Sequence, residues 1–222
     1  MNKPKDLDPL AEKILDRLST REEAGEIVLG GYFALKHYLD YRPTHDIDAW
    51  WRTGVAYATE RAIEQVMRAI ADEEQLGFEK RRFGDTISFE FLREGQRIFS
   101  FQIALRSVEL EEAIASPWPP ILIETLADNV GAKMNALVDR GAPRDFSDIK
   151  HLADAHLVDA SRCWELWRKK NPCEDERAAK DKVRLHLSGI QARRPLESIK
   201  EIAKRLEAQA TREWFMSEFL KP

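Results

Sequence analysis

The chain has 222 residues, of which 43% are hydrophobic and 33% charged, and it contains six Trp and ten Phe. This much apolar surface excludes a disordered chain and predicts a core large enough for one domain and a smaller second one. No stretch approaches the roughly 18 apolar residues of a membrane span, and residues 1–18 lack the apolar run of a secretory signal. We therefore expect a soluble cytoplasmic protein, and its two cysteines exclude a disulfide framework or a four-ligand zinc site.

The net charge of −4 is distributed unevenly along the chain. Residues 157–222 hold 15 Lys and Arg against 11 Asp and Glu, so this segment is positive by itself. Because contacts with phosphate depend on local charge, the C-terminal third has two interpretations. It could face RNA, or it could be a solvated helical surface, which is the commoner cause of such a bias.

In the first half of the chain, helical and strand patterns alternate. Apolar residues at spacings of three and four predict three helices, over residues 8–24, 32–39 and 55–75. Short apolar or alternating runs predict four strands, over residues 26–29, 46–51, 86–92 and 97–105. The last two strands are expected to pair as a hairpin.

Beyond the prolines at positions 117, 119 and 120, the strand signals vanish. Helical spacing then predicts helices over residues 121–140, 145–156, 160–170, 174–190 and 195–220. The sequence therefore predicts the α+β class, with a mixed sheet and its helices in residues 1–116 and a helical domain in residues 117–222.

Two aspartates mark the predicted strand 46–51. Side chains at positions i and i+2 of a strand point to the same face, so Asp46 and Asp48 should project side by side while Ile47 and Ala49 pack inward. Two adjacent carboxylates suit Mg²⁺, which keeps few protein ligands and completes its shell with water and phosphate oxygens. Alone, an Asp-x-Asp pair is also common on protein surfaces.

Gly30 and Gly31 lie between a predicted strand and a predicted helix. Glycines there allow the backbone to approach a phosphate, toward which the following helix directs its N–H groups. Left-handed turns use glycine routinely as well, so the pair gains meaning from the aspartates that follow.

Together these residues resemble the opening motif of the nucleotidyltransferase superfamily, in the form found in the AbiEii/AbiGii toxin family of phage-defence and toxin–antitoxin systems. The motif reads Leu29-Gly30-Gly31, then Arg42-x-Thr44-x-Asp46-Ile47-Asp48. A second block supports the resemblance, and it reads Ala132-Lys133-x-x-Ala136-Leu137-x-x-Arg140, then Arg144-Asp145-x-x-Asp148-Ile149-x-x-Leu152. The resemblance covers about residues 26–155.

The second block also makes sense physically. Lys133 and Arg140 fall on one helix face, with Arg144 just beyond a turn, and three cations would neutralise a triphosphate. Asp145 and Asp148 share a face at the start of the next helix. The alternative is that the acids favour the positive end of that helix and that the cations are solvated.

The resemblance implies that an NTP donates an NMP to an acceptor hydroxyl, with Mg²⁺ bound by Asp46 and Asp48. Thr44, with Gly30 and Gly31, would position the nucleotide phosphates. The helical domain would complete the active site through Lys133, which contacts the triphosphate, and through Arg140, Arg144, Asp145 and Asp148. The residues expected to take part in catalysis are Asp46, Asp48, Lys133 and Asp145.

The sequence departs from the family pattern at the third carboxylate, which many nucleotidyltransferases carry on a neighbouring strand. Strand 97–105 offers Gln102 there, and Glu90 on the partner strand could substitute or could be a surface residue. Otherwise the base would come from Asp145 or Asp148, or the chain would bind nucleotide without turnover.

Three functions therefore stay open. The first is a toxin that modifies RNA, such as a tRNA-like acceptor, or a protein, and that is countered by a cognate antitoxin. The second is a small-molecule nucleotidyltransferase of the antibiotic-modifying type. The third is a nucleotide-binding or partner-binding module without turnover. His45 is expected to be structural, and Trp50, Trp51, Trp164 and Trp167 are expected to pack rather than stack on bases.

Overall fold

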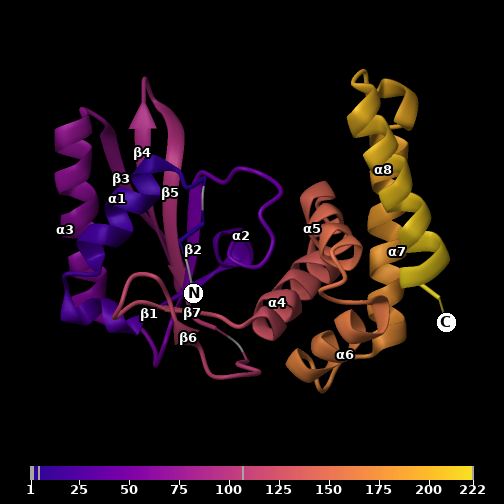
Figure 1. Ribbon diagram of the computed structural model, residues 1–222, viewed down its shortest axis with the longest axis horizontal. Coiled ribbons are helices and arrows are strands. Elements are labelled where there is room, and N and C mark those ends of the chain that lie inside the picture. Colours follow the sequence, from indigo (N-terminus) through magenta and orange to yellow (C-terminus); the bar gives the residue numbers. More distant parts are fainter. Residues whose placement is uncertain (1–2, 5, 107, 222) are drawn as a thin grey trace. The chain divides into compact units, whose positions relative to one another are not determined.

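The computed structural model describes residues 3–4, 6–106 and 108–221, and the chain divides into two compact units, Met1–Asn129 and Val130–Pro222. The predicted α+β class with a helical C-terminal part is confirmed (Figure 1). The first unit extends beyond the expected boundary at residue 116, because the sheet continues past the prolines. The expectation that the chain is helical from Ile121 onward is wrong at Leu122–Ile123, which is a strand.

The first unit contains a seven-stranded mixed sheet of order β3-β4-β5-β2-β1-β7-β6. Strand β2 lies centrally, antiparallel to β1 and parallel to β5. The sequence did not predict β3, because this edge strand is mostly charged and exposed and lacks an apolar face. The strands are β1 (Ile27–Gly30), β2 (Asp46–Trp51), β3 (Gly77–Phe83), β4 (Thr86–Arg93), β5 (Gln96–Ala104), β6 (Ile114–Ala115) and β7 (Leu122–Ile123).

The hairpin of β4 and β5 forms as predicted, with Arg93 paired to Gln96. The two intervening residues, Glu94 and Gly95, have φ of 53° and 75°. Positive φ at both central residues is the backbone of a type I′ turn, whose twist matches that of the strands. A β-bulge between Phe91 and Leu92 then shifts the register by one residue, and this shift places Phe89 opposite Phe101, in the core.

Helices α1 (Pro9–Leu18) and α3 (Tyr57–Glu74) cover one face of the sheet (Figure 1). Asp8 caps α1 by accepting a hydrogen bond from the Leu10 N–H at 2.8 Å. The third helix, α2 (Gly31–Leu35), is shorter than the predicted 32–39. Because the core lies between the sheet and α1 and α3, inward-facing residues of the central strands are apolar and their neighbours face the opposite side.

The second unit consists of helices joined by short turns. The prediction of one helix over residues 195–220 is wrong, since a 3₁₀ turn (Leu196–Ser198), α8 and a π-turn (Phe215–Phe219) share that span. In the described ranges, no helix has the length and apolarity to cross a membrane. The helices are α4 (Leu126–Asp139), which begins in the first unit, α5 (Pro143–Asp154), α6 (Ala160–Lys170), α7 (Glu176–Arg193) and α8 (Ile202–Trp214).

Both cysteines are free thiols, as expected: Cys163 is buried and Cys173 is exposed. Burial raises the pKa of the Cys163 thiol to about 12, so it stays protonated at neutral pH. A thiol without thiolate character is a poor nucleophile, which assigns Cys163 to packing.

Candidate active site

The central strand β2 carries Asp46 and Asp48 on the face opposite the core. Ile47 lies between the two aspartates and Ala49 follows them, and both are buried. The aspartates are half-buried, so the predicted alternation is confirmed. Asp46 lies opposite Ser100 of β5, and Asp48 lies between Gln102 of β5 and Gly30 of β1. The two carboxylates therefore share one face at the middle of the sheet.

Gly30 and Gly31 are required by close packing against this strand. Gly31 has φ of +60°, and a Cβ there would lie 2.1 Å from Oδ2 of Asp48. A Cβ at Gly30 would lie 2.2 Å from Nε1 of Trp50. Any larger residue would displace Asp48 or Trp50, so the glycine pair determines how the strand–helix turn contacts β2.

Thr44 holds Asp46 in place. Its Oγ1 donates a hydrogen bond to Oδ1 of Asp46, and the Thr44 side chain is itself buried. A hollow of about 320 Å³ adjoins these two residues, and its lining includes Arg42 and Arg97. The arginines place positive charge beside Asp46, in a space open to solvent.

The donor set of Asp46 and Asp48 fits a hard divalent cation. Across residues 3–4, 6–106 and 108–221, no group of three His, Cys, Asp or Glu side chains could enclose a metal ion. Two carboxylate ligands are what Mg²⁺ needs when substrate phosphates and water supply the other oxygens. Asp46 and Asp48 thus suit a cation that arrives with a nucleotide.

No carboxylate lies on β5 next to the aspartates, because Ser100 and Gln102 occupy the adjacent positions. Glu90 of β4 lies opposite Ser100, in the same cross-strand row as Asp46 but one strand further. It is only 5% exposed and accepts a hydrogen bond from Ser88 Oγ at 3.1 Å. Glu90 is therefore a buried carboxylate on the aspartate face, rather than the surface glutamate that was the alternative.

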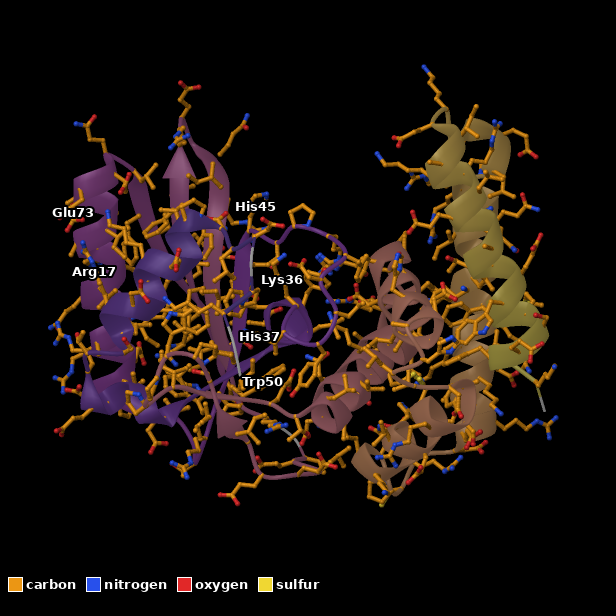
Figure 2. The ribbon with its side chains drawn as sticks, in the orientation of Figure 1. Arg17, Lys36, His37, His45, Trp50 and Glu73 are labelled. Carbon is orange, nitrogen blue, oxygen red and sulfur yellow. The ribbon has the colours of Figure 1, made fainter. Side chains whose placement is uncertain are left out.

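A buried polar network supports the glycine turn, and no sequence pattern indicated it. The indole N–H of Trp50 (labelled in Figure 2) donates to Glu124 at 3.0 Å. The Asn129 amide donates to the Gly31 carbonyl at 2.7 Å and to Glu124 at 2.5 Å. Glu124 and Asn129 are fully buried, so these bonds fix the backbone beside Asp48.

In the second unit, Lys133 of α4 forms an ion pair with Asp148 of α5, with Nζ 2.7 Å from Oδ2. Asp148 is fully buried and the Lys133 side chain is 11% exposed. Burial strengthens the pairing and makes the loss of either partner costly. Lys133 and Asp148 therefore join two helices, whatever else they bind.

Arg140, the residue directly after α4, forms a second link from the end of that helix to Asp145 of α5. The Arg140 guanidinium donates to both carboxylate oxygens of Asp145, at 3.0 and 2.8 Å, and the Ala142 N–H donates to Asp145 at 2.9 Å. Asp145 therefore caps the N-terminus of α5. This agrees with the alternative in which the acids favour the positive end of that helix. Arg144 lies exposed beside Asp145.

The remaining candidates behave as structural residues. The His45 side chain contacts Asp8, with Nδ1 2.7 Å from Oδ2. Trp51, Trp164 and Trp167 are buried, so the expectation that they pack is confirmed.

A mixed sheet whose central strand carries Asp-x-Asp beside a Gly-Gly turn defines the chain as a protein of the nucleotidyltransferase-like class. The profile of the family described as "Nucleotidyl transferase AbiEii toxin, Type IV TA system" matches residues 13–218. The chain belongs to this family, whose match also covers the helices after His156 that the sequence motifs left out. A search of curated proteins found no match.

Proposed function

We propose that this protein transfers an NMP from an NTP to an acceptor hydroxyl in a Mg²⁺-dependent reaction. The observation that carries the proposal is the pair Asp46 and Asp48 on the non-core face of β2, with Asp46 lining a hollow that Arg42 and Arg97 also line. Carboxylates for a cation and guanidinium groups for phosphate oxygens are the two components that a metal-bound triphosphate requires.

In this reaction the acceptor oxygen attacks the α-phosphorus, the bond from that phosphorus to the bridging oxygen breaks, and pyrophosphate leaves. The hydroxyl proton passes to a carboxylate or to water. Mg²⁺, when bound, would supply Lewis acidity toward the phosphate oxygens. Asp46 and Asp48 would hold the cation, Thr44 would keep Asp46 oriented, and the two arginines would balance the charge of the triphosphate.

The residues of the second unit keep the roles that the resemblance implies, with one change. An ammonium carries three donors, so the pairing of Lys133 with Asp148 is compatible with a phosphate oxygen as a further acceptor. Asp145 receives three hydrogen bonds from Arg140 and Ala142, and we assign it to positioning Arg140 rather than to proton transfer.

The family is one of type IV toxin–antitoxin systems, so membership implies a cognate antitoxin. We propose RNA as the acceptor, because residues 157–222 carry more basic than acidic groups. The competing function is nucleotide binding without turnover. Ser100 and Gln102 support it, since β5 provides no carboxylate to activate an acceptor.

The test is label transfer from each α-³²P-labelled NTP to total cellular RNA in the presence of Mg²⁺. We expect the native protein to label RNA, Asp46→Asn to abolish labelling, and Asp72→Asn to leave it unchanged. Asp72 is a matched control because it is an exposed aspartate on α3. NTP binding without transfer to any acceptor would favour the binding module, and equal labelling by Asp46→Asn would contradict the proposal.

A further inference from the structure

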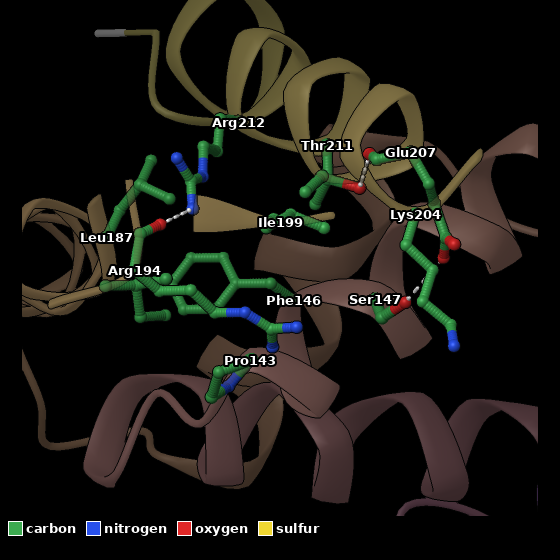
Figure 3. A pocket seen from close by; sticks show the side chains of 12 residues that line it. Pro143, Phe146, Ser147, Leu187, Arg194, Ile199, Lys204, Glu207, Thr211 and Arg212 are labelled. Atoms are coloured by element: carbon green, nitrogen blue, oxygen red, sulfur yellow. Dashed lines mark hydrogen bonds between the residues drawn. The ribbon is translucent and has the colours of Figure 1, made fainter. Parts of the chain in front are cut away.

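Helices α5, α7 and α8 of the second unit enclose a pocket of about 230 Å³. Figure 3 shows Thr211 and Glu207 descending from α8 on one side and Pro143 and Phe146 on α5 on the other. Because all of its lining residues belong to one compact unit, the pocket is complete without the first unit.

The interior of this pocket is apolar. Phe146, Leu187, Ile190 and Ile199 line it, and each is at most 9% exposed. A cavity of about 150 Å³ with a similar lining of Leu, Ile and Phe is large enough for benzene. The larger volume here accommodates a substituted or fused ring, and burying that body would be favourable at about 25 cal/mol per Å² of apolar surface.

One end of the pocket is strongly basic. Arg212 donates a hydrogen bond from Nη2 to the Arg194 carbonyl at 2.7 Å, and the Arg194 side chain runs from this end of the pocket along Phe146 (Figure 3). Burial, and then the charge of Arg194, lowers the pKa of Arg212. The Glu197 charge acts in the opposite direction on that pKa, but within the part of the chain that the structure describes no carboxylate forms an ion pair with either arginine.

The polar groups at the other end are already paired. Glu207 accepts a hydrogen bond from Ser147 at 3.3 Å, and Lys204 forms an ion pair with Glu201 at 2.7 Å. The two ends of the pocket therefore differ in charge. The electrostatic energy of a bound anion would be most favourable at Arg194 and Arg212, and Glu207 would repel it at the other end.

We propose that this pocket is a binding site for a small amphipathic anion, with a flat apolar body in the pocket and a carboxylate or phosphate group at Arg194 and Arg212. The apolar interior supplies affinity and the two guanidinium groups supply selectivity for negative charge. The inference does not rest on the proposed transfer reaction. Since Phe146 and Ser147 lie between Asp145 and Asp148 along α5, an occupied pocket would also brace the helix that carries these aspartates.

The test uses 2-naphthoate as the probe and 2-naphthamide as its uncharged isostere, with the full-length protein. Binding is followed by ¹H–¹³C NMR of the Leu187, Ile190 and Ile199 methyl groups, and thermal melting checks that each variant is folded. We expect both probes to shift these methyl signals and naphthoate to bind about tenfold more tightly than naphthamide.

Three variants locate the charge selectivity. Arg212→Met and Arg194→Met should each weaken naphthoate binding by about tenfold and leave naphthamide binding unchanged, because Met keeps an apolar stem. Arg212→Lys should retain most of the affinity for naphthoate. Arg205→Met is the matched control, since Arg205 lies on α8 outside the pocket lining and should have no effect.

Three results would each overturn the proposal. The first is that naphthoate shifts none of the three methyl groups. The second is that naphthamide binds the native protein as tightly as naphthoate does. The third is that Arg205→Met weakens naphthoate binding as much as Arg212→Met does.

Discussion

Each unit contains one pair of aspartates, and the two pairs have different surroundings. Asp46 and Asp48 on β2 are half-buried, and Asp46 lines a solvent-open hollow. Asp145 and Asp148 on α5 are fully buried, and they pair with Arg140, the residue after α4, and with Lys133 of α4, at 2.8 and 2.7 Å. The strand pair therefore lies closer to solvent, whereas the helix pair is buried together with cationic side chains.

This difference indicates how a motif residue contributes. A buried carboxylate with a built-in cation stabilises the fold, because removal of one partner leaves an unpaired buried charge. A half-buried carboxylate on an open face adds little to stability, because solvent screens its interactions. The same substitution in the two units should consequently affect different properties.

The largest expected effect is on activity. Asp46→Asn should lower NTP transfer by about 1,000-fold, because one of two cation ligands loses its charge. The free energy of unfolding should change by no more than about 0.5 kcal/mol, since Asp46 is half-buried. Transfer kinetics and urea unfolding measure both. A large loss of stability would show that Asp46 is structural, like the helix aspartates.

The second effect is on stability. Asp148→Asn should lower the free energy of unfolding by about 3–5 kcal/mol, because it leaves the Lys133 ammonium without its buried partner. The double substitution Lys133→Met with Asp148→Leu should recover much of this loss. Urea unfolding of the three variants is the measurement. If Asp148→Asn were as stable as the native protein, the contrast between the two units would fail.

A smaller loss is expected for the second link between α4 and α5. Arg140→Met should cost about 1–2 kcal/mol, because the Arg140 side chain is 53% exposed and the Ala142 N–H continues to bind Asp145. The same unfolding assay measures it. If Arg140→Met lowered the free energy of unfolding as much as Asp148→Asn does, solvent exposure of Arg140 would not reduce the contribution of this ion pair to stability.

The smallest expected effect on stability is at Glu73, a solvent-exposed carboxylate that is also paired with cations. Hydrogen bonds from Arg17, and then from Lys13, lower the pKa of Glu73 from 4.5 to about 2 (Figure 2). A lowered pKa stabilises the fold above pH 4.5, and this contribution is lost as the pH falls toward 2. Glu73→Gln should barely change stability at pH 7, because Glu73 is solvent-exposed.

The measurement for Glu73 is an NMR titration of its side-chain carboxyl carbon. We expect a midpoint near 2 that moves toward 4.5 in 1 M NaCl, because salt screens exposed pairs. A midpoint of 4.5 at low salt would show that Arg17 and Lys13 do not bind this carboxylate in solution.

Local patterns were sufficient to predict much of the fold. Alternation predicted β2 and the inward direction of Ile47, and apolar spacing predicted α3. Strands β3 and β7 were missed for physical reasons. Strand β3 is an exposed edge with charged residues, and β7 has only two residues, held by pairing with β1.

The site was predictable only where it depends on local geometry. Placing Asp46 and Asp48 on one face needs only the period of a strand. The ion pair of Lys133 with Asp148 and the bonds of Glu124 to Trp50 join residues distant in sequence, so no local pattern indicates them. The same holds for the pocket of the second unit, which three separate helices enclose.

We propose that Asp46 and Asp48 together hold a cation that accompanies an NTP. Isothermal titration calorimetry of NTP binding, with and without Mg²⁺, tests it directly in the native protein and in the double variant Asp46→Asn with Asp48→Asn. We predict that the native protein binds NTP in a Mg²⁺-dependent manner and that the double variant, although folded, does not. Equal Mg²⁺-dependent binding by both proteins would contradict the claim.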